Sequence, residues 1–142
     1  MKSMKDFARH IIKVANQYAD GITNLQLQKV MYFSIKDFLN DHQNSELIKS
    51  FYREPFETWD YGPVVPIIFD TYRYYGNMII LDKGKYNSFF KPFDKYIKHN
   101  LKEDIFNLIE KSQKQPIWKK HQNQILDHQA TYQYQIKDII LN

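Results

Sequence analysis

One stretch decides where this chain reverses direction: Trp59-Asp60-Tyr61-Gly62-Pro63-Val64-Val65-Pro66. Gly62 can adopt a positive φ, while Pro63 fixes its own φ and biases Gly62 away from the α region. Pro66 suits the first position of a helix, where its missing N–H costs nothing, and Gly76 suits the residue just past the end. The stretch therefore predicts a turn at Gly62 and Pro63, followed by a short helix over residues 66–75.

Strand-like residues precede this turn. Phe56, Thr58 and Trp59 are aromatic or β-branched, which favours a strand leading into the Gly-Pro turn. A second apolar run, Met78 to Leu81, predicts a short buried strand closed by a turn signal. Leu47 to Tyr52 is compatible with either a short strand or a helical turn. We therefore expect a short β-hairpin or ribbon around the Trp-x-Tyr-Gly-Pro turn.

Helical periodicity dominates the rest of the chain. Apolar residues recur at helical spacing over residues 4–19 and 24–41, and Thr23 with Gln26 matches a capping box at the start of the second helix. A third helical pattern runs from Pro92 to about residue 112, with a break near 99–100, and a terminal helix begins at Trp118 with an interruption near Thr131. The predicted fold is mainly α (α+β), a compact multi-helix domain spanning residues 1–142.

Composition limits the kinds of function. The chain has 142 residues, no cysteine and a net charge of +4, so disulfides, thiolate nucleophiles and cysteine zinc sites are excluded. No apolar run approaches the roughly 20 residues of a membrane span, and the N-terminus has no unbroken apolar signal region. We expect a cytoplasmic protein without membrane partners. The basic excess leans weakly towards acidic or nucleic-acid partners.

The sequence offers no convincing catalytic or metal site. Asp127 and His128 are neighbours that would project about 100° apart on a helix, and His121 lies two turns from His128, too far for an adjacent ligand pair, which favours solvated side chains. Glu54 and Glu57 are a candidate carboxylate pair on or beside the predicted strand, but they would face the same way only if one position were bulged, and without a further acid they favour solvation or pairing with lysine. No glycine-framed serine elbow and no phosphate-binding glycine loop is present. We therefore expect neither an enzyme nor a bound cofactor or metal.

A lysine stripe raises nucleic-acid binding as an alternative. Positions 91, 95, 98 and 102 are all lysine and lie along one helical face. Phe90, Phe93 and Tyr96 lie between them and would add stacking surfaces for bases. Acidic residues dilute the stripe, and a lysine face opposite an apolar face is ordinary for a soluble helix. Nucleic acid is therefore the less favoured partner.

Aromatic and cationic residues near the turn are better candidates for recognition. Trp59 and Tyr61 lie at the predicted turn, and helical spacing directs Arg73 and Tyr74 outward while residues 72 and 75 pack inward. Exposed tyrosine and arginine at a rigid corner are low-entropy anchors for a protein partner. Trp59 is also compatible with a place in the core.

Two stretches carry a resemblance to a known family. Residues 23–32, TNLQLQKVMY, and residues 54–66, EPFETWDYGPVVP, followed by Tyr72 to Gly76, resemble the Panacea antitoxin domain, the SocA-like family. That family's pattern opens with a "TNLKLQKLLYY"-like helix and continues through an "EAW-x-YGPVVP" turn. It ends with a Pro-Trp near the last helix. This chain departs from it by carrying Ser112 where a histidine is frequent and Pro116-Ile117-Trp118 where Pro and Trp are adjacent.

The resemblance implies a mostly helical, non-enzymatic antitoxin from bacteria or their phages. Such a protein binds and neutralises a cognate protein toxin encoded next to it, and Trp118, at the family's Pro-Trp position, joins the predicted partner contacts. Some members are linked to delivery of a toxin to a protease. The alternatives are a proteolytic adaptor or phage or prophage regulator, and a nucleic-acid-binding protein.

Overall fold

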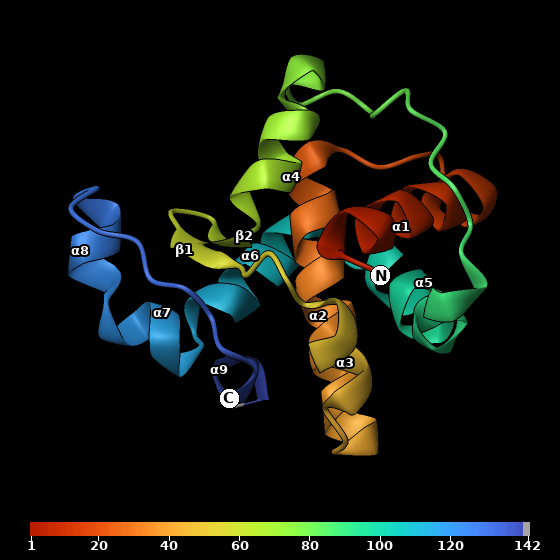
Figure 1. Cartoon of the computed structure of the whole chain (residues 1–142). Coiled ribbons are helices and arrows are strands. Elements are labelled where there is room, and N and C mark those ends of the chain that lie inside the picture. The colour runs from red at the N-terminus through yellow and green to blue at the C-terminus, as the bar shows by residue number, and fades with distance from the viewer. Residues whose placement is uncertain (141–142) are drawn as a thin grey trace.

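The computed structural model describes residues 1–140 of the chain. Its elements follow one another as α1 (Met4–Tyr18), α2 (Asn24–His42), α3 (Glu46–Phe51), β1 (Glu57–Trp59), β2 (Gly62–Val64), α4 (Pro66–Thr71), η1 (Arg73–Tyr75), η2 (Ser88–Phe93), α5 (Asp94–Leu101), α6 (Ile105–Gln113), α7 (Pro116–Lys120), α8 (Gln122–Leu126) and α9 (Ile136–Ile140). Figure 1 shows helices surrounding one small hairpin. The fold is mainly α with a short β-ribbon, as the sequence predicts.

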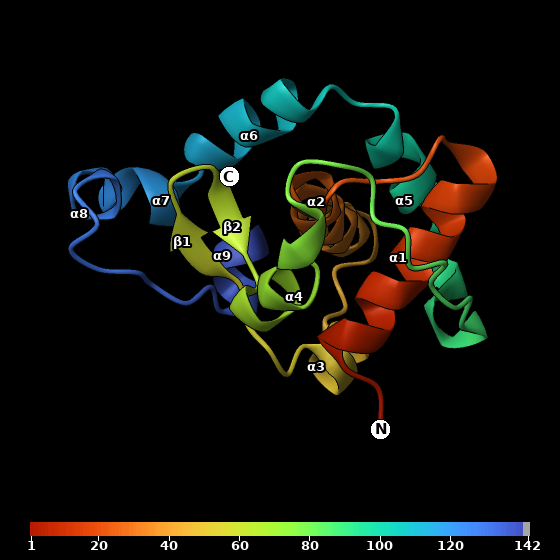
Figure 2. The same cartoon turned by 90° about the horizontal axis from the view of Figure 1, so that it is seen from above.

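Helix α2 is the central element of the fold. It contacts α1, α5, α6, α9 and β2, and Figure 2 shows the other elements arranged around its axis. The predicted apolar face of this helix is buried, but so are polar residues on its other faces, including Gln28, Lys29 and Ser34. A helix buried on all sides needs partners for such groups, and the hairpin supplies two of them.

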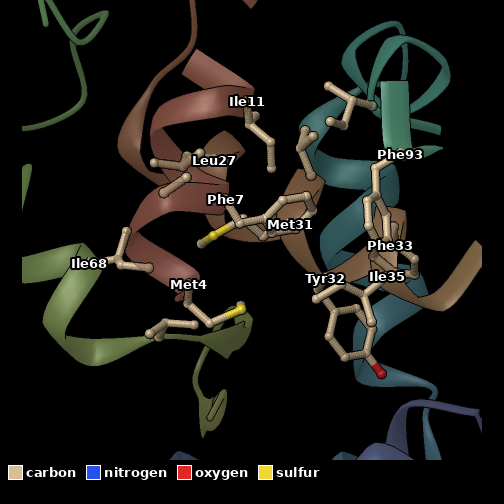
Figure 3. Packing of buried hydrophobic residues seen from close by; sticks show 14 of the residues in the cluster. Met4, Phe7, Ile11, Leu27, Met31, Tyr32, Phe33, Ile35, Ile68 and Phe93 are labelled. Carbon is tan, nitrogen blue, oxygen red and sulfur yellow. The ribbon is translucent and has the colours of Figure 1, made fainter. Parts of the chain in front are cut away.

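The core between α1 and α2 is rich in aromatic rings (Figure 3). Phe7 lies 5.2 Å, centroid to centroid, from each of Phe51, Phe90 and Phe93. Tilted and edge-on rings at this separation gain about 0.5–1.5 kcal/mol each beyond area burial. Phe90 and Phe93 are fully buried and Tyr96 nearly so. These three rings fill the core and are therefore not available to stack on bases, as the nucleic-acid alternative would require.

The start of α2 is capped as predicted. The Thr23 hydroxyl accepts a hydrogen bond from the Gln26 amide at 3.2 Å, and the Gln26 side-chain oxygen accepts one from the Thr23 amide at 2.9 Å. The two bonds satisfy donors that a helix N-terminus otherwise leaves unpaired. This capping box fixes where the central helix begins.

The predicted hairpin is present. Strands β1 and β2 pair antiparallel, with Trp59 opposite Gly62 and Thr58 opposite Pro63. A two-residue connection, Asp60 and Tyr61, joins them. The predicted position of the turn, at Gly62 and Pro63, is wrong by two residues, because both lie in β2 and pair with β1. Gly62 has φ +100°, which confirms its predicted positive φ.

The helix after the hairpin is shorter than expected. Pro66 occupies the first turn of α4, as predicted, but the α-helix ends at Thr71 and the 3₁₀-helix η1 follows it. Gly76 ends η1 with φ +58°, and its amide donates to the Arg73 carbonyl at 2.9 Å. The expected stop at Gly76 is therefore present, with a change of helix type before it.

The predicted strand over residues 78–81 is wrong. This stretch forms a single bridge, between Ile79 and Thr23, and only Ile80 is buried, whereas Met78 is 72% and Leu81 78% exposed. A bridge to one residue cannot bury a run of side chains on both faces. Residues 47–52, left open between strand and helical turn, belong largely to helix α3.

The C-terminal third is more broken than predicted. The expected helix from residue 92 to 112 divides into η2, α5 and α6, with the break at residues 102–104. The interruption of the terminal helix, expected near Thr131, extends over residues 127–135: residues 127–129 form a turn, and residues 130–135 are an extended segment that leads to α9. Figure 1 shows this extended segment running beside β1. Within residues 1–140, no helix has the length and apolarity to cross a bilayer.

Candidate protein-binding surface

Two side chains of α2 form hydrogen bonds with the backbone of the hairpin and of the residue that follows it. The Lys29 ammonium nitrogen donates to the Pro63 carbonyl at 2.8 Å, and the Gln28 side-chain oxygen accepts from the Val65 amide at 2.8 Å. Both contacts are buried, where a hydrogen bond is strengthened and an unpaired group is costly. The backbone of β2 is thereby fixed to the central helix.

Side chains of α6 and α7 form hydrogen bonds with two further carbonyl groups of the hairpin. The Gln113 side-chain nitrogen donates to the Asp60 carbonyl at 2.9 Å, and the Trp118 indole nitrogen donates to the Trp59 carbonyl at 2.8 Å. Trp118 is 3% exposed. A turn whose carbonyls are held in this way is preorganised, so little ordering remains to be done when a partner binds.

Gly62, the first residue of β2, is required by space as well as by φ. A β-carbon added at Gly62 would overlap the Ser112 hydroxyl oxygen and lie 3.2 Å from the Lys29 side chain. Ser112, from α6, is fully buried and donates to the Ile109 carbonyl at 2.7 Å. Three elements thus converge on a position that only glycine fits.

Lys29 is an unusual residue in this arrangement. Its side chain is fully buried, and no carboxylate in the described residues forms an ion pair with it. Loss of hydration on burial lowers the pKa of Lys29 from 10.5 to about 7. A buried amine that donates to a backbone carbonyl serves the hairpin in either protonation state, because both states carry N–H donors.

The extended segment after α8 completes the hairpin's outer edge. The Thr58 amide donates to the Tyr132 carbonyl at 3.0 Å, and the Tyr134 amide donates to the Phe56 carbonyl at 2.9 Å. The Thr58 hydroxyl also accepts from the Tyr132 amide at 2.9 Å. The edge of β1 is therefore covered, which removes a template for unwanted strand pairing.

Between the hairpin and this segment lies an apolar pocket of about 440 Å³, which we call the hairpin pocket. Its size is within the range of binding pockets in proteins, about 300–1,000 Å³. Trp59 and Phe69 meet edge-on in its wall with centroids 5.2 Å apart. The lining residues are Leu25, Thr58, Trp59, Asp60, Tyr61, Val64, Phe69, Ile125, His128, Gln129, Ala130 and Thr131.

The lining of the hairpin pocket carries little charge. Asp60 and His128 are its ionisable acid and base, and the His128 Nε2 lies 2.8 Å from the Asp60 carboxylate. The contact joins the tip of the hairpin to the turn that precedes the extended segment. His128 has φ +57°, a conformation that is uncommon for a residue with a side chain and is held here by the surrounding contacts. Among the residues that the structure describes, no lysine or arginine lines the pocket.

The structure groups three of the five predicted contact residues at the hairpin. Trp59 is half-buried in the pocket wall, and Tyr61 at the tip is 62% exposed. Trp118 lies beneath, with its buried indole bonded to the Trp59 carbonyl. Trp118 therefore stabilises the hairpin from within the fold, whereas the side chains of Trp59 and Tyr61 are available to a partner.

Arg73 and Tyr74 lie elsewhere, on η1 at the far end of α4 (Figure 1). Tyr74 is 94% exposed, and Arg73 is exposed and paired with Asp70. Their predicted outward orientation is confirmed, as is the inward packing of Tyr72 and Tyr75. Neither Arg73 nor Tyr74 lines the hairpin pocket, so the predicted set covers two surfaces.

Sequence reasoning missed half of the pocket. Leu25, Phe69 and Ile125 come from three different helices, and residues 129–131 come from the segment predicted as helix. A local pattern cannot bring such distant residues together. One signal was present, because Tyr132 and Tyr134 alternate with polar residues in a period of two, which is typical of a strand.

The histidines considered as metal ligands have other partners. His121 stacks on Tyr132 at 3.6 Å between centroids, and His128 contacts Asp60. Within residues 1–140, no cluster of three or more histidine, aspartate or glutamate side chains is arranged to hold a metal ion. The carboxylates considered as a catalytic pair also diverge, since Glu54 accepts from the Met4 amide and Glu57 from the Trp59 indole.

The lysine stripe forms a shallow surface. Lys91, Lys95 and Lys98 surround a hollow that also contains Asp94. The Lys98 ammonium lies 3.8 Å from the centroid of the Tyr18 ring, a cation–π contact. With Phe90, Phe93 and Tyr96 buried, this surface offers lysine contacts to phosphate but lacks the stacking rings that the sequence suggested.

Comparison of the chain with protein-family models, curated proteins and solved structures finds no match. The resemblance to the Panacea antitoxin family stays a prediction based on the residues quoted above.

Proposed function

We propose that this chain is a cytoplasmic antitoxin of a bacterial or phage toxin–antitoxin system, which neutralises a protein toxin by binding it directly and has no enzymatic activity of its own. The observation that carries the proposal is the preorganised hairpin with its apolar pocket and exposed Tyr61. Rigid aromatic residues around a concave apolar surface are characteristic of energetic centres in protein interfaces. The resemblance to the Panacea family supplies the class of partner.

Fixed backbone geometry supports occlusion as the mode of action. The hairpin carbonyls of Trp59, Asp60 and Pro63 are each held by a helix side chain. A partner that docks on this corner meets a surface already in its bound shape, so less free energy is lost to ordering. Such a surface suits a stoichiometric inhibitor that covers the functional surface of the toxin.

Co-expression with the product of the adjacent open reading frame tests the proposal. We expect that product to arrest growth alone and to be harmless together with this chain, in a protease-deficient host as well as in the parent strain. The pair should also co-elute as a complex of the two purified proteins. A Tyr61→Ala variant should weaken rescue, whereas Phe106→Ala, which removes a 73% exposed ring on α6, should not.

The outcomes separate the alternatives. Rescue that requires the host protease would favour a proteolytic adaptor. A neighbour that is harmless alone, or toxic and not rescued, contradicts the antitoxin proposal. Tight retention on duplex DNA at physiological salt, lost on replacement of Lys95 and Lys98, would instead favour the nucleic-acid alternative.

A further inference from the structure

The hairpin pocket is concave and largely apolar, with a few polar groups in its lining. Its floor and walls come from Leu25, Val64, Phe69 and Ile125, while Asp60 and His128 lie together at the hairpin tip. A site of this kind takes an uncharged group into the floor and orients it through the few polar groups at the edge.

The charge at the edge is acidic, although the chain as a whole is basic. Asp60 is a carboxylate with 41% of its side chain exposed. Glu57, whose side chain accepts from the Trp59 indole at 3.3 Å, adds a second carboxylate beside the pocket wall. With no lysine or arginine in the lining, a cation on the partner finds an attractive neighbour there and an anion a repulsive one.

We infer that the hairpin pocket receives one large apolar side chain of a partner protein, such as tryptophan, phenylalanine or leucine, and that a lysine or arginine next to it on the partner pairs with Asp60. The inference rests on the proposed function only in taking a protein as the occupant. It adds the chemistry by which that partner is chosen. Specificity arises because an acidic segment is rejected at the same edge that attracts a basic one.

Two variants isolate the two parts of this recognition. Ala130 lies half-buried in the lining, so Ala130→Trp fills the pocket from an irregular segment without altering a helix. Asp60→Asn removes the charge and keeps the shape. Phe106→Ala is the matched surface control, since Phe106 is 73% exposed and lies outside the pocket.

The experiment selects binders from a displayed random peptide library on the purified full-length chain and then measures the selected synthetic peptides by fluorescence anisotropy. Enriched peptides should share a large apolar residue with a lysine or arginine within a few positions. Ala130→Trp should weaken their binding by at least about thirtyfold, the scale of an interface hot spot. Asp60→Asn should weaken it by about threefold to tenfold and reduce its salt dependence, while Phe106→Ala leaves it unchanged.

Other outcomes overturn the inference. These are the failure to enrich any peptide, enrichment of acidic peptides, or binding that Ala130→Trp leaves intact. A dimer of the chain by light scattering that Ala130→Trp dissociates would show that a second copy fills the pocket. If the motif is selected but the neighbouring product is not neutralised in cells, the proposed function fails and the pocket chemistry stands. If the neighbouring product is neutralised but no peptide motif is selected, the proposed function stands and the inference about the pocket fails.

Discussion

Replacement of Lys29 by methionine should change how stability depends on pH. The wild-type amine is fully buried and its pKa is lowered to about 7 from 10.5. Between these two values the unfolded chain binds a proton that the folded chain does not. The free energy of unfolding therefore rises with pH across this window, and the full penalty is present below pH 7.

The magnitude follows from the two pKa values of Lys29. One pH unit corresponds to about 1.4 kcal/mol, so the whole window is equivalent to about 5 kcal/mol. Methionine retains the length and apolar surface of the side chain and has no proton to lose. Its own cost is the unpaired Pro63 carbonyl, about 1–3 kcal/mol at all pH values. The pH-dependent part therefore belongs to the amine alone.

Urea unfolding followed by circular dichroism at several pH values gives the measurement. The free energy of unfolding of wild type minus that of Lys29→Met should increase by about 3 kcal/mol from pH 7.5 to 9.5. Because the other titratable groups are the same in both proteins, their contributions to the pH dependence cancel in this difference. Lys5→Met, at an exposed position of α1, should run parallel to wild type. A pH-independent difference for Lys29→Met would refute the reasoning, because it would mean that the buried amine titrates like one in water.

The remaining predictions concern the turn, a buried histidine and the second exposed surface. Gly62→Val should destabilise the fold by about 3 kcal/mol or more, against about 1–2 kcal/mol for Gly76→Ala, where added atoms meet nothing within 4 Å; similar thermal shifts would contradict the close approach at Gly62. Burial lowers the pKa of His10, against the opposing effect of Asp94, so the free energy of unfolding should fall as pH decreases below 6.5. The fall should be smaller in His10→Gln. If urea unfolding gives the same pH dependence for both proteins below pH 6.5, His10 is not its cause. Tyr74→Ala and Arg73→Ala should each weaken the complex with the proposed toxin by about threefold to thirtyfold without lowering the melting temperature; unchanged affinity of both variants in calorimetry would place the interface away from η1.

Local chemistry was sufficient to predict the elements whose causes lie in neighbouring residues. The Thr23 and Gln26 capping box, the positive φ of Gly62 and the start of α4 at Pro66 each depend on residues within a few positions of one another. The outward orientation of Tyr74 follows from helical spacing in the same way. Such features are readable because the backbone conformation is set by adjacent side chains.

Features that depend on distant partners were beyond such reasoning. Residues 78–81 resemble a buried strand, yet their one bridge is to Thr23 and most of the run is exposed. Nothing in the neighbouring sequence distinguishes Lys29 from a surface lysine of its helix. Its burial is explained by the tertiary contact with the Pro63 carbonyl. The hairpin pocket joins Leu25 to Ile125. Tertiary packing decides these positions, and a single sequence does not record which elements meet.

The strand-like stretch at residues 132–134 has a consequence for synthesis of the protein. It pairs with Phe56 and Thr58, whose own hairpin emerges from the ribosome much earlier. A growing chain therefore has no finished pocket until this late stretch arrives. Prematurely terminated copies that stop before residue 134 are expected to lack the complete pocket, so only molecules translated past this residue are expected to be competent for binding.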